Sequence, residues 1–147
     1  IRDRLYSGWR ISELLNLKPE DINLQAGTMK GGTKTKAGKD RVVPIHSKIR
    51  ALVEARLAEG GPRLISYNGR ACSQTQYRVF WADIMKALEM NHTPHECRHT
   101  FETQLDSAGA NRKCIDLLMG HVSKDTGNRV YNHKTLDELK ATVELIQ

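Results

Sequence analysis

The stretch of sequence that decides the fold is Thr93-Pro94-His95-Glu96-Cys97-Arg98-His99-Thr100-Phe101, and Leu118-Met119-Gly120-His121 follows it. Pro94 predicts the first turn of a helix, because no backbone donor is needed there. His95 and Arg98 are three residues apart, so they share one face near the start of that helix. A helix N-terminus carries free N–H groups and positive dipole charge. The stretch therefore predicts a helix that presents a histidine and an arginine to an anion.

Hydrophobic spacing and turn residues predict a mostly helical chain around one small sheet. We expect helices at residues 1–10, 12–17 (capped by Ser12), 47–60, 73–90, 93–107 and 111–119 (capped by Asn111), around Tyr131, and from Thr135 to the end. Strands are expected at residues 22–24, 28–35 and 41–45, joined into an antiparallel meander. The pattern contains no βαβ alternation, which disfavours a dinucleotide-binding fold. The predicted class is α+β, mainly α-helical with a small antiparallel three-stranded sheet.

Two of the expected helices have apolar stripes that predict their buried faces. In the helix at residues 73–90 the stripe consists of Tyr77, Phe80, Trp81, Ile84 and Leu88. In the C-terminal helix it consists of Leu136, Leu139, Val143 and Ile146. We expect each stripe to face another part of the protein.

Length, charge and cysteine content limit the class of protein. The 147 residues suffice for one domain, and a net charge of +6 with a pI near 9.4 favours a polyanionic partner. No apolar run approaches the roughly 20 residues of a membrane span, and the charged opening does not fit a signal peptide. Three cysteines without a Cys-x-x-Cys pair disfavour a zinc site or a disulfide framework, and they fit a reducing cytoplasm. The opening lacks an N-cap, so we expect the sequence to start inside an element.

The histidines at 92, 95 and 99 offer a metal site as an alternative to an anion site. No acid or cysteine completes this set at a recognised zinc spacing. Arg98 lies between two of the histidines and would repel a cation. We therefore expect neither a metal nor another cofactor.

Two further clusters have plain local interpretations. Arg10 and Glu13 share a helix face, which by itself indicates a surface ion pair. Residues 30–41 form a basic hairpin with one acid, Asp40, and five cations: Lys30, Lys34, Lys36, Lys39 and Arg41. That composition fits either a solvated turn or a finger that contacts phosphates.

The order of these clusters resembles the tyrosine recombinase (phage integrase) family, in particular the catalytic domain of integrases from phages and conjugative transposons. The order is Arg-x-x-Glu, the basic hairpin, His-x-x-Arg-His-Thr, Leu-Met-Gly-His, and Tyr131 ten residues after His121. The resemblance runs from Gly8 to about Leu145 and implies the catalytic core of a DNA breaking–rejoining enzyme. We expect one catalytic domain at residues 1–147, without the family's longer helical lead-in and N-terminal DNA-clamping domain. Cys97 departs from the family, where leucine is commoner.

The resemblance assigns roles to individual residues. It implies that the catalytic residues are Arg10, Lys34, His95, Arg98, His121 and Tyr131, with Glu13, Lys36 and His99 in supporting positions. Thr33-Lys34-Thr35 matches the family's Thr-Lys-Thr and favours Lys34, whereas counting back from Val43-Pro44 favours Lys36; we choose Lys34. The expected DNA contacts are Lys30, Lys36, Lys39 and Arg41.

These residue types suit cleavage of a phosphodiester. Arginines offer permanent charge and paired donors to the non-bridging oxygens. A tyrosine, with an ordinary pKa of about 10, needs a histidine or a positive field to become a nucleophile. The resemblance implies that Tyr131 forms a 3′-phosphotyrosine and that Lys34 protonates the 5′-hydroxyl, without metal or ATP.

The resemblance also implies partners and alternatives. The partner is double-stranded DNA, on which the protein forms an oligomer, a tetrameric synapse, in the cytoplasm, associated with the nucleoid and not with a membrane. The C-terminal helix packs either on its own domain or, as in many relatives, on a neighbouring subunit. Type IB topoisomerases share the same constellation of residues and are one alternative. The others are a DNA-binding fragment that is inactive alone and, more distantly, a metallonuclease.

Overall fold

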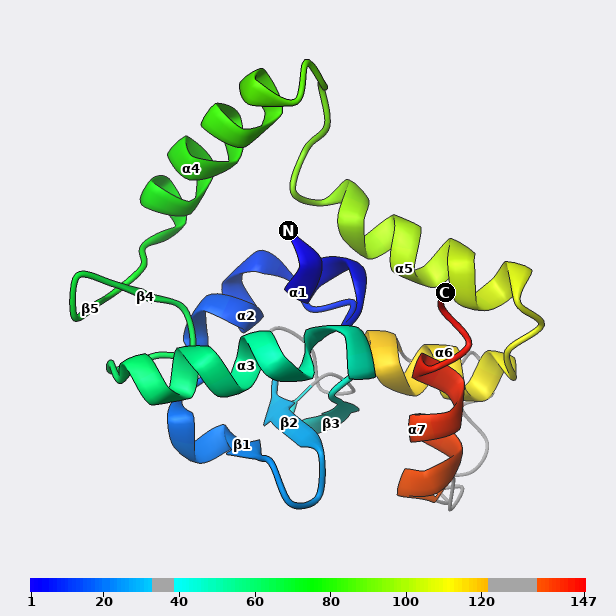
Figure 1. Ribbon diagram of the computed structural model, residues 1–147. Coiled ribbons are helices and arrows are strands. Elements are labelled where there is room, and N and C mark those ends of the chain that lie inside the picture. Colours follow the sequence, from blue (N-terminus) through cyan, green and yellow to red (C-terminus); the bar gives the residue numbers. More distant parts are fainter. Residues whose placement is uncertain (33–38, 122–134) are drawn as a thin grey trace.

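The computed structural model describes residues 1–32, 39–121 and 135–147, and its elements are shown in Figure 1. The α-helices of this part are α1 (Arg2–Leu5), α2 (Ile11–Asn16), α3 (Ser47–Glu59), α4 (Gln74–Ala87), α5 (Glu96–Ser107), α6 (Arg112–Met119) and α7 (Leu136–Val143). A 3₁₀ turn, η1 (Pro19–Asp21), follows α2. The strands are β1 (Ile22–Asn23), β2 (Thr28–Gly31), β3 (Arg41–Pro44), β4 (Ser66–Tyr67) and β5 (Arg70–Ala71). The predicted class, mainly helical with a small antiparallel sheet, is confirmed.

The larger sheet is an antiparallel meander in the order β1-β2-β3, as expected. Met29 pairs with Ile22 on one side and with Val43 on the other, and Gly31 pairs with Arg41. Met29 and Val43 are buried, so one face of this sheet belongs to the core. β2 ends at Gly31, four residues before the predicted end of the strand.

A second, two-stranded sheet of β4 and β5 is not among the strands predicted from the sequence. Asn68 and Gly69 join its strands with φ values of +51° and +72°. Two left-handed residues in succession fit the turn that matches the twist of a two-residue hairpin. The Asn-Gly pair was therefore a usable signal for this hairpin.

The main core lies between the inner face of the β1-β2-β3 sheet and the helices around it. In Figure 1, α3 crosses in front of this sheet, while α6 and α7 lie side by side at one end of it. The core includes Trp9 and Leu14 before and in α2, Phe101 in α5, and Ile115 in α6. None of the helices in the described ranges is long and apolar enough to cross a membrane.

Helix starts confirm two predicted caps and correct a third. The Asn111 side chain accepts a hydrogen bond from the Lys113 N–H at 3.0 Å, and the Thr135 hydroxyl accepts one from the Glu138 N–H at 3.3 Å. Ser12, however, lies inside α2, whose N-cap is Arg10. The Glu13 carboxylate takes over the capping function by accepting the Arg10 backbone N–H at 3.0 Å.

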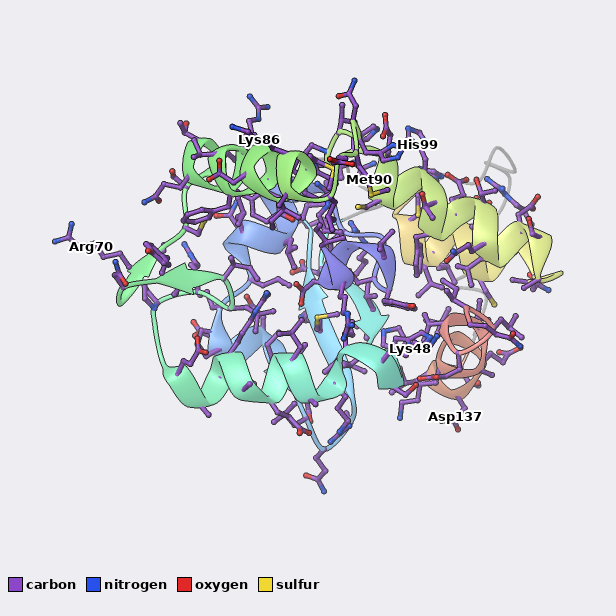
Figure 2. All side chains as sticks on the ribbon, turned by 45° about the horizontal axis from the view of Figure 1, so that its top comes forward. Lys48, Arg70, Lys86, Met90, His99 and Asp137 are labelled. Carbon is purple, nitrogen blue, oxygen red and sulfur yellow. The ribbon has the colours of Figure 1, made fainter. Side chains whose placement is uncertain are left out.

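The expected buried stripe of α4 is wrong in part. Trp81 and Met85 are buried in a small second core with Cys97, whereas Ile84 and Leu88 are exposed. The helix is turned so that positions 77, 81 and 85 pack against Ile1 and Leu5 around α1 and against Cys97 of α5. Trp81 Nε1 also donates a hydrogen bond to the His92 carbonyl at 2.6 Å. Figure 2 shows Lys86 on α4 and Arg70 on the β4–β5 hairpin, both pointing outward.

Candidate active site

The turn between α1 and α2 is built on Gly8, which has a φ of +63°. A Cβ at this position would lie 2.5 Å from the Cδ1 atom of Phe101. Glycine is therefore required both by the left-handed backbone and by the close approach of α5. The turn fixes the Gly8 carbonyl and places Arg10 directly at the start of α2.

Arg98 on α5 is the centre of the site and is only 3% exposed. Its guanidinium donates hydrogen bonds to the backbone carbonyls of Gly8 and Met119. Burial, and then the positive charges of Arg10 and Arg41, lower the pKa of Arg98 to about 10. The side chain therefore remains a cation at neutral pH, held between the α1–α2 turn and the end of α6.

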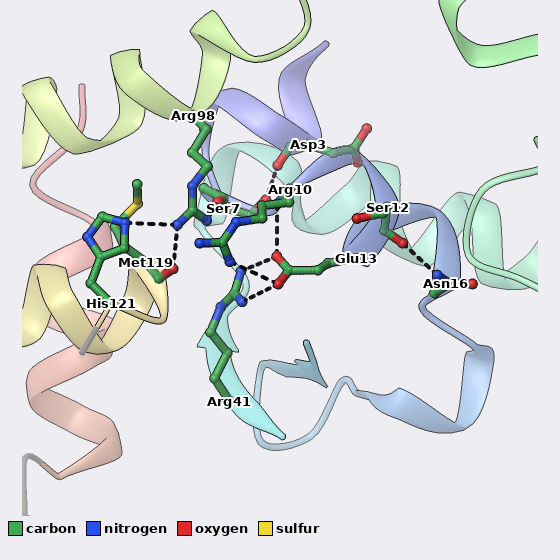
Figure 3. A network of polar contacts seen from close by, with 11 residues as sticks. Asp3, Ser7, Arg10, Ser12, Glu13, Asn16, Arg41, Arg98, Met119 and His121 are labelled. Carbon is green, nitrogen blue, oxygen red and sulfur yellow. Dashed lines mark hydrogen bonds and ion pairs between the residues drawn. The ribbon is translucent and has the colours of Figure 1, made fainter. Parts of the chain in front are cut away.

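The Glu13 carboxylate is shared by two arginines (Figure 3). It accepts two hydrogen bonds from Arg41, at 3.0 and 2.9 Å, and one from Arg10 Nη1 at 3.1 Å. Burial by itself would raise the pKa of Glu13, but the hydrogen bonds and charges of Arg41 and Arg10 outweigh it and lower that pKa. Arg10 and Glu13 are thus more than the surface pair that their spacing alone indicates.

Arg41 is not placed as expected. It was assigned to the DNA-contacting hairpin, yet it is only 7% exposed. Its guanidinium is bound to Glu13, and its Cζ lies 4.1 Å from the centre of the Trp9 ring. The structure thus places the Arg41 guanidinium inside the domain, and its expected contact with DNA stays a prediction. The number of charges along the hairpin does not reveal that Arg41 pairs with Glu13, 28 positions earlier in the sequence.

His121 follows α6 and lies beside Arg98, with Nε2 3.3 Å from Arg98 Nη2. Burial and the Arg98 charge lower its pKa, so the neutral ring is favoured. On its other side, Nδ1 is 3.9 Å from the Glu102 carboxylate, which also binds Arg112 at 2.9 Å. Sequence reasoning missed Glu102, although its spacing of four from Arg98 places both on one face of α5.

His95 and His99 lie at the start of α5 and are exposed, with ring centres 4.6 Å apart (His99 is labelled in Figure 2). Partial desolvation, followed by the charges of His99, Arg4 and Arg98, lowers the pKa of His95. His92 pairs with Glu96 at 2.8 Å instead of joining them. Within the described residues, no three histidine, cysteine or acidic side chains are arranged to hold a metal ion.

Three predicted residues lie outside the described part of the chain: Lys34, Lys36 and Tyr131. Lys30 and Lys39, at the edges of the hairpin, are exposed. The structure thus brings Arg10, Glu13, Arg98 and His121 together, with Arg41 behind Glu13.

Charge and donor geometry define what this cluster can do. Three guanidinium groups surround one carboxylate, so the cluster carries a surplus of positive charge. Arg10 remains partly exposed, and Figure 3 shows its guanidinium next to that of Arg98. Two adjacent arginines with a neutral histidine beside them suit an oxyanion with several oxygens, such as a phosphate.

A comparison with family models identifies the class of protein to which this site belongs. The model described as the phage integrase family matches residues 4–138. This span is most of the 147 residues, and the chain belongs to that family.

Curated relatives agree with this assignment. The chain is 36% identical to the tyrosine recombinase XerC of Pelobacter propionicus over 148 residues, which covers 95% of this chain and 48% of that protein. It is 35% identical to the tyrosine recombinase XerA of Pyrococcus furiosus over 160 residues, covering 98% of this chain and 54% of that protein. The chain therefore spans about half the length of the curated relatives it matches.

Solved structures share the fold. The integrase from mycobacterium phage Brujita matches with a TM-score of 0.69 at 20% identity, over 98% of this chain and 49% of that one. The Tn1549 transposon integrase, in complex with transposon right end DNA, matches with a TM-score of 0.71 at 24% identity, over 95% of this chain and 55% of that one. The arrangement of helices and the small sheet is that of an integrase catalytic core.

Proposed function

We propose that this chain is the catalytic domain of a site-specific DNA recombinase that cuts and rejoins DNA through Tyr131. The observation that carries the proposal is the placement of Arg98 between the Gly8 and Met119 carbonyls, with Arg10 on one side and His121 on the other. Membership of the phage integrase family supports it. We assign residues 1–147 to one catalytic domain.

In the proposed first step the phenolic oxygen of Tyr131 attacks the phosphorus and the P–O5′ bond breaks. The phenolic proton passes to a histidine, His121 or His95, and Lys34 gives a proton to the departing 5′-oxygen. Arg10 and Arg98 donate to the non-bridging oxygens, where negative charge grows in the transition state. The products are a 3′-phosphotyrosine and a free 5′-hydroxyl.

In the second step the 5′-hydroxyl of another strand gives its proton to Lys34 and attacks the phosphotyrosine, and the Tyr131 oxygen leaves and takes back the proton from the histidine. The new P–O5′ bond replaces the P–O bond to tyrosine, so the phosphodiester count is unchanged and no ATP is needed. The lowered pKa values of His95 and His121 favour neutral rings, which are able to accept a proton near pH 7. Protein cations take the place of a metal ion.

The proposed partner is double-stranded DNA. The Tn1549 integrase structures are complexes with DNA, and the net charge of +6 suits the same polyanion. We further propose that the protein acts in a tetrameric synapse and is associated with the nucleoid in the cytoplasm. Exposed Lys30 and Lys39 are the proposed backbone contacts beside the site.

A nicked suicide substrate tests the proposal, because loss of the short 5′-hydroxyl fragment traps the covalent intermediate. We expect an SDS-resistant protein–DNA adduct that Tyr131→Phe abolishes and that Tyr67→Phe, a matched change on the exposed β4–β5 hairpin, leaves intact. An adduct that persists in Tyr131→Phe refutes the nucleophile. Formation in EDTA argues against a metallonuclease, and strand transfer between two DNA molecules separates a recombinase from a topoisomerase.

A second substrate tests the choice of general acid. With a 5′-phosphorothiolate the leaving sulfur needs no proton, so the cleavage defect of Lys34→Ala should largely vanish. Lys36→Ala should instead weaken DNA binding in a salt-dependent manner. Rescue of Lys36→Ala rather than Lys34→Ala would reverse the assignment.

A further inference from the structure

Arg41 is a buried cation for which the proposed reaction has no direct use. Its two terminal nitrogens bind both oxygens of Glu13, at 3.0 and 2.9 Å. The Arg10 side chain reaches the same carboxylate with one nitrogen, at 3.1 Å, beside the Arg10 backbone N–H at 3.0 Å. Glu13 therefore has its main partner in Arg41 and a weaker one in Arg10, although Arg10 is only three residues away in sequence.

The surroundings hold Arg41 in this position. Its guanidinium lies over the Trp9 ring, 4.1 Å from the centre, and Trp9 directly precedes Arg10. On the neighbouring strand Gly31 pairs with Arg41, and a Cβ at Gly31 would come within 2.7 Å of Leu17 and 3.4 Å of Trp9. The end of the hairpin is thus packed on the segment that carries Arg10.

The pairing of charges around Glu13 determines whether the Arg10 guanidinium is free to bind a ligand. A buried carboxylate must be neutralised, because an unpaired charge in the interior is strongly unfavourable. With Arg41 present, this residue of β3 neutralises the Glu13 carboxylate. Arg10 then keeps hydrogen-bond donors and positive charge for another anion. Without Arg41, Arg10 is the cation among the described residues that remains bonded to Glu13, and the carboxylate would draw it into a two-pronged ion pair.

We infer that Arg41 is a positioning residue, which neutralises Glu13 so that Arg10 stays free to bind the scissile phosphate. Arg41 touches no substrate in this arrangement and acts through Glu13 and Trp9. The same contacts hold β3 against the segment that carries Arg10. The inference rests on the proposed function, but its test below does not require DNA cleavage.

The first measurement is the affinity of the full chain for inorganic phosphate. The NMR signals of the arginine Nε–H groups report the binding. Arg10→Ala identifies the part of the binding that belongs to this site. We expect Arg41→Gln, which keeps a donor but loses the charge, to weaken that binding about tenfold, the scale of one charge-assisted hydrogen bond. The double change Glu13→Gln with Arg41→Gln should return it to within about threefold of the wild type.

Two variants control for folding. Arg56→Gln breaks the Asp3–Arg56 ion pair, 2.9 Å long and away from Arg10, and should leave phosphate affinity unchanged. Arg41→Lys keeps the charge without the two-pronged geometry. If Arg41→Gln does not fold, Arg41→Lys decides: affinity near the wild type supports the inference, and a tenfold loss overturns it.

The outcomes separate this inference from the proposed function. Recovery of phosphate affinity in the double variant supports the inference. If the single and double variants bind phosphate equally weakly, Arg41 has a merely structural role and the inference is overturned. A wild type that binds no phosphate through Arg10 overturns it as well. If the wild type binds phosphate through Arg10 and the variants change this affinity as expected, but no DNA adduct forms, only the proposed function is refuted. Where the adduct forms, Arg41→Gln should slow cleavage more than it weakens DNA binding.

Discussion

The ring of His46 donates a hydrogen bond from Nε2 to the carbonyl of Ile146, at 2.9 Å. His46 is the N-cap of α3 and its Nδ1 accepts the Lys48 N–H, so both ring nitrogens are used. Nearby, the Glu144 carboxylate accepts the backbone N–H and the hydroxyl of Ser47, each at 2.7 Å. The end of the chain is therefore fastened to the start of α3 in its own domain. In this single chain the C-terminal stripe packs on its own domain, and docking on a neighbouring subunit stays a prediction.

This packing predicts that α7 is part of the domain's stability. Ile146 is 3% exposed and Leu145 is 43% exposed, so they form a matched pair one residue apart. Ile146→Ala should lower the free energy of unfolding by about 2–5 kcal/mol, and Leu145→Ala should change it little. Deletion after Lys134 should abolish cooperative melting at moderate temperature, because Leu139 and Val143 are lost as well.

Thermal denaturation at two protein concentrations checks the prediction. A helix packed on its own domain gives a Tm that does not depend on concentration, whereas exchange between subunits makes the Tm rise with concentration. Equal effects of Ile146→Ala and Leu145→Ala would contradict the observed packing.

A glycine pair tests the turn that holds Arg98. Gly8 and Gly109 both have positive φ, +63° and +74°, but a Cβ meets Phe101 at Gly8 and nothing within 4 Å at Gly109. Gly109→Ala should therefore cost about 1–2 kcal/mol of stability, for the left-handed backbone alone. Gly8→Ala should cost about 1–3 kcal/mol more from overpacking, and it should shift the carbonyl that accepts from Arg98. Urea denaturation of both variants measures the difference; equal losses would show that Phe101 moves aside freely.

The two arginines that are proposed to be catalytic should behave differently when each is removed. Arg10→Ala should slow adduct formation on the order of a hundredfold. Its fold should be retained, because Arg41 still neutralises Glu13. Arg98→Ala should slow the reaction similarly and also lower stability by about 1–3 kcal/mol, since the buried carbonyls of Gly8 and Met119 lose their donor.

Single-turnover cleavage and thermal melting of each variant separate these effects. Wild-type cleavage by either variant would show that its arginine is only an ion-pair partner. An Arg10→Ala protein that melts far below the Arg98→Ala protein would reverse the structural ranking of the two side chains.

Much of the site could be predicted because its motifs are local. His-x-x-Arg at the start of α5 and Gly-His at the end of α6 are set by short-range helix geometry, and their order along the chain resembles one family. The pairing of Arg41 with Glu13 could not be predicted, because a basic hairpin does not reveal which of its cations faces a buried carboxylate on another element. That choice is made by the packing of Trp9, Gly31 and Glu13, which are distant in sequence.

The same reasoning explains the errors in the fold. The helix at residues 74–87 has apolar residues around more than half of its circumference, so its periodicity permits several buried faces. Contacts with α1 and α5 select the face with Trp81 and Met85. Ser12 is a good cap in isolation, yet the turn at Gly8 starts the helix one residue earlier, at Ile11, and Glu13 supplies the acceptor.

Glu102 should set the protonation of His121, and this can be measured directly. The pKa of His121 is lowered by burial and by Arg98, and raised by Glu102 and Asp116. Glu102→Gln removes one of the raising charges, so the NMR titration midpoint of the His121 ring should move to lower pH. Asp106→Asn is the matched control, since Asp106 also lies near Arg112, at 4.0 Å, but is not among the charges that act on His121. It should leave the midpoint unchanged.

The consequence for cleavage follows from the sign of this shift. A histidine accepts a proton only in its neutral form, which prevails above its pKa. If His121 accepts the Tyr131 proton, the acidic limb of the cleavage profile should move to lower pH in Glu102→Gln. The maximal rate should fall at the same time, because the ring loses the carboxylate that lies beside Nδ1. An NMR midpoint of His121 that moves while the cleavage limb stays in place would assign the acceptor role to His95, whose pKa is lowered mainly by desolvation and by His99, Arg4 and Arg98.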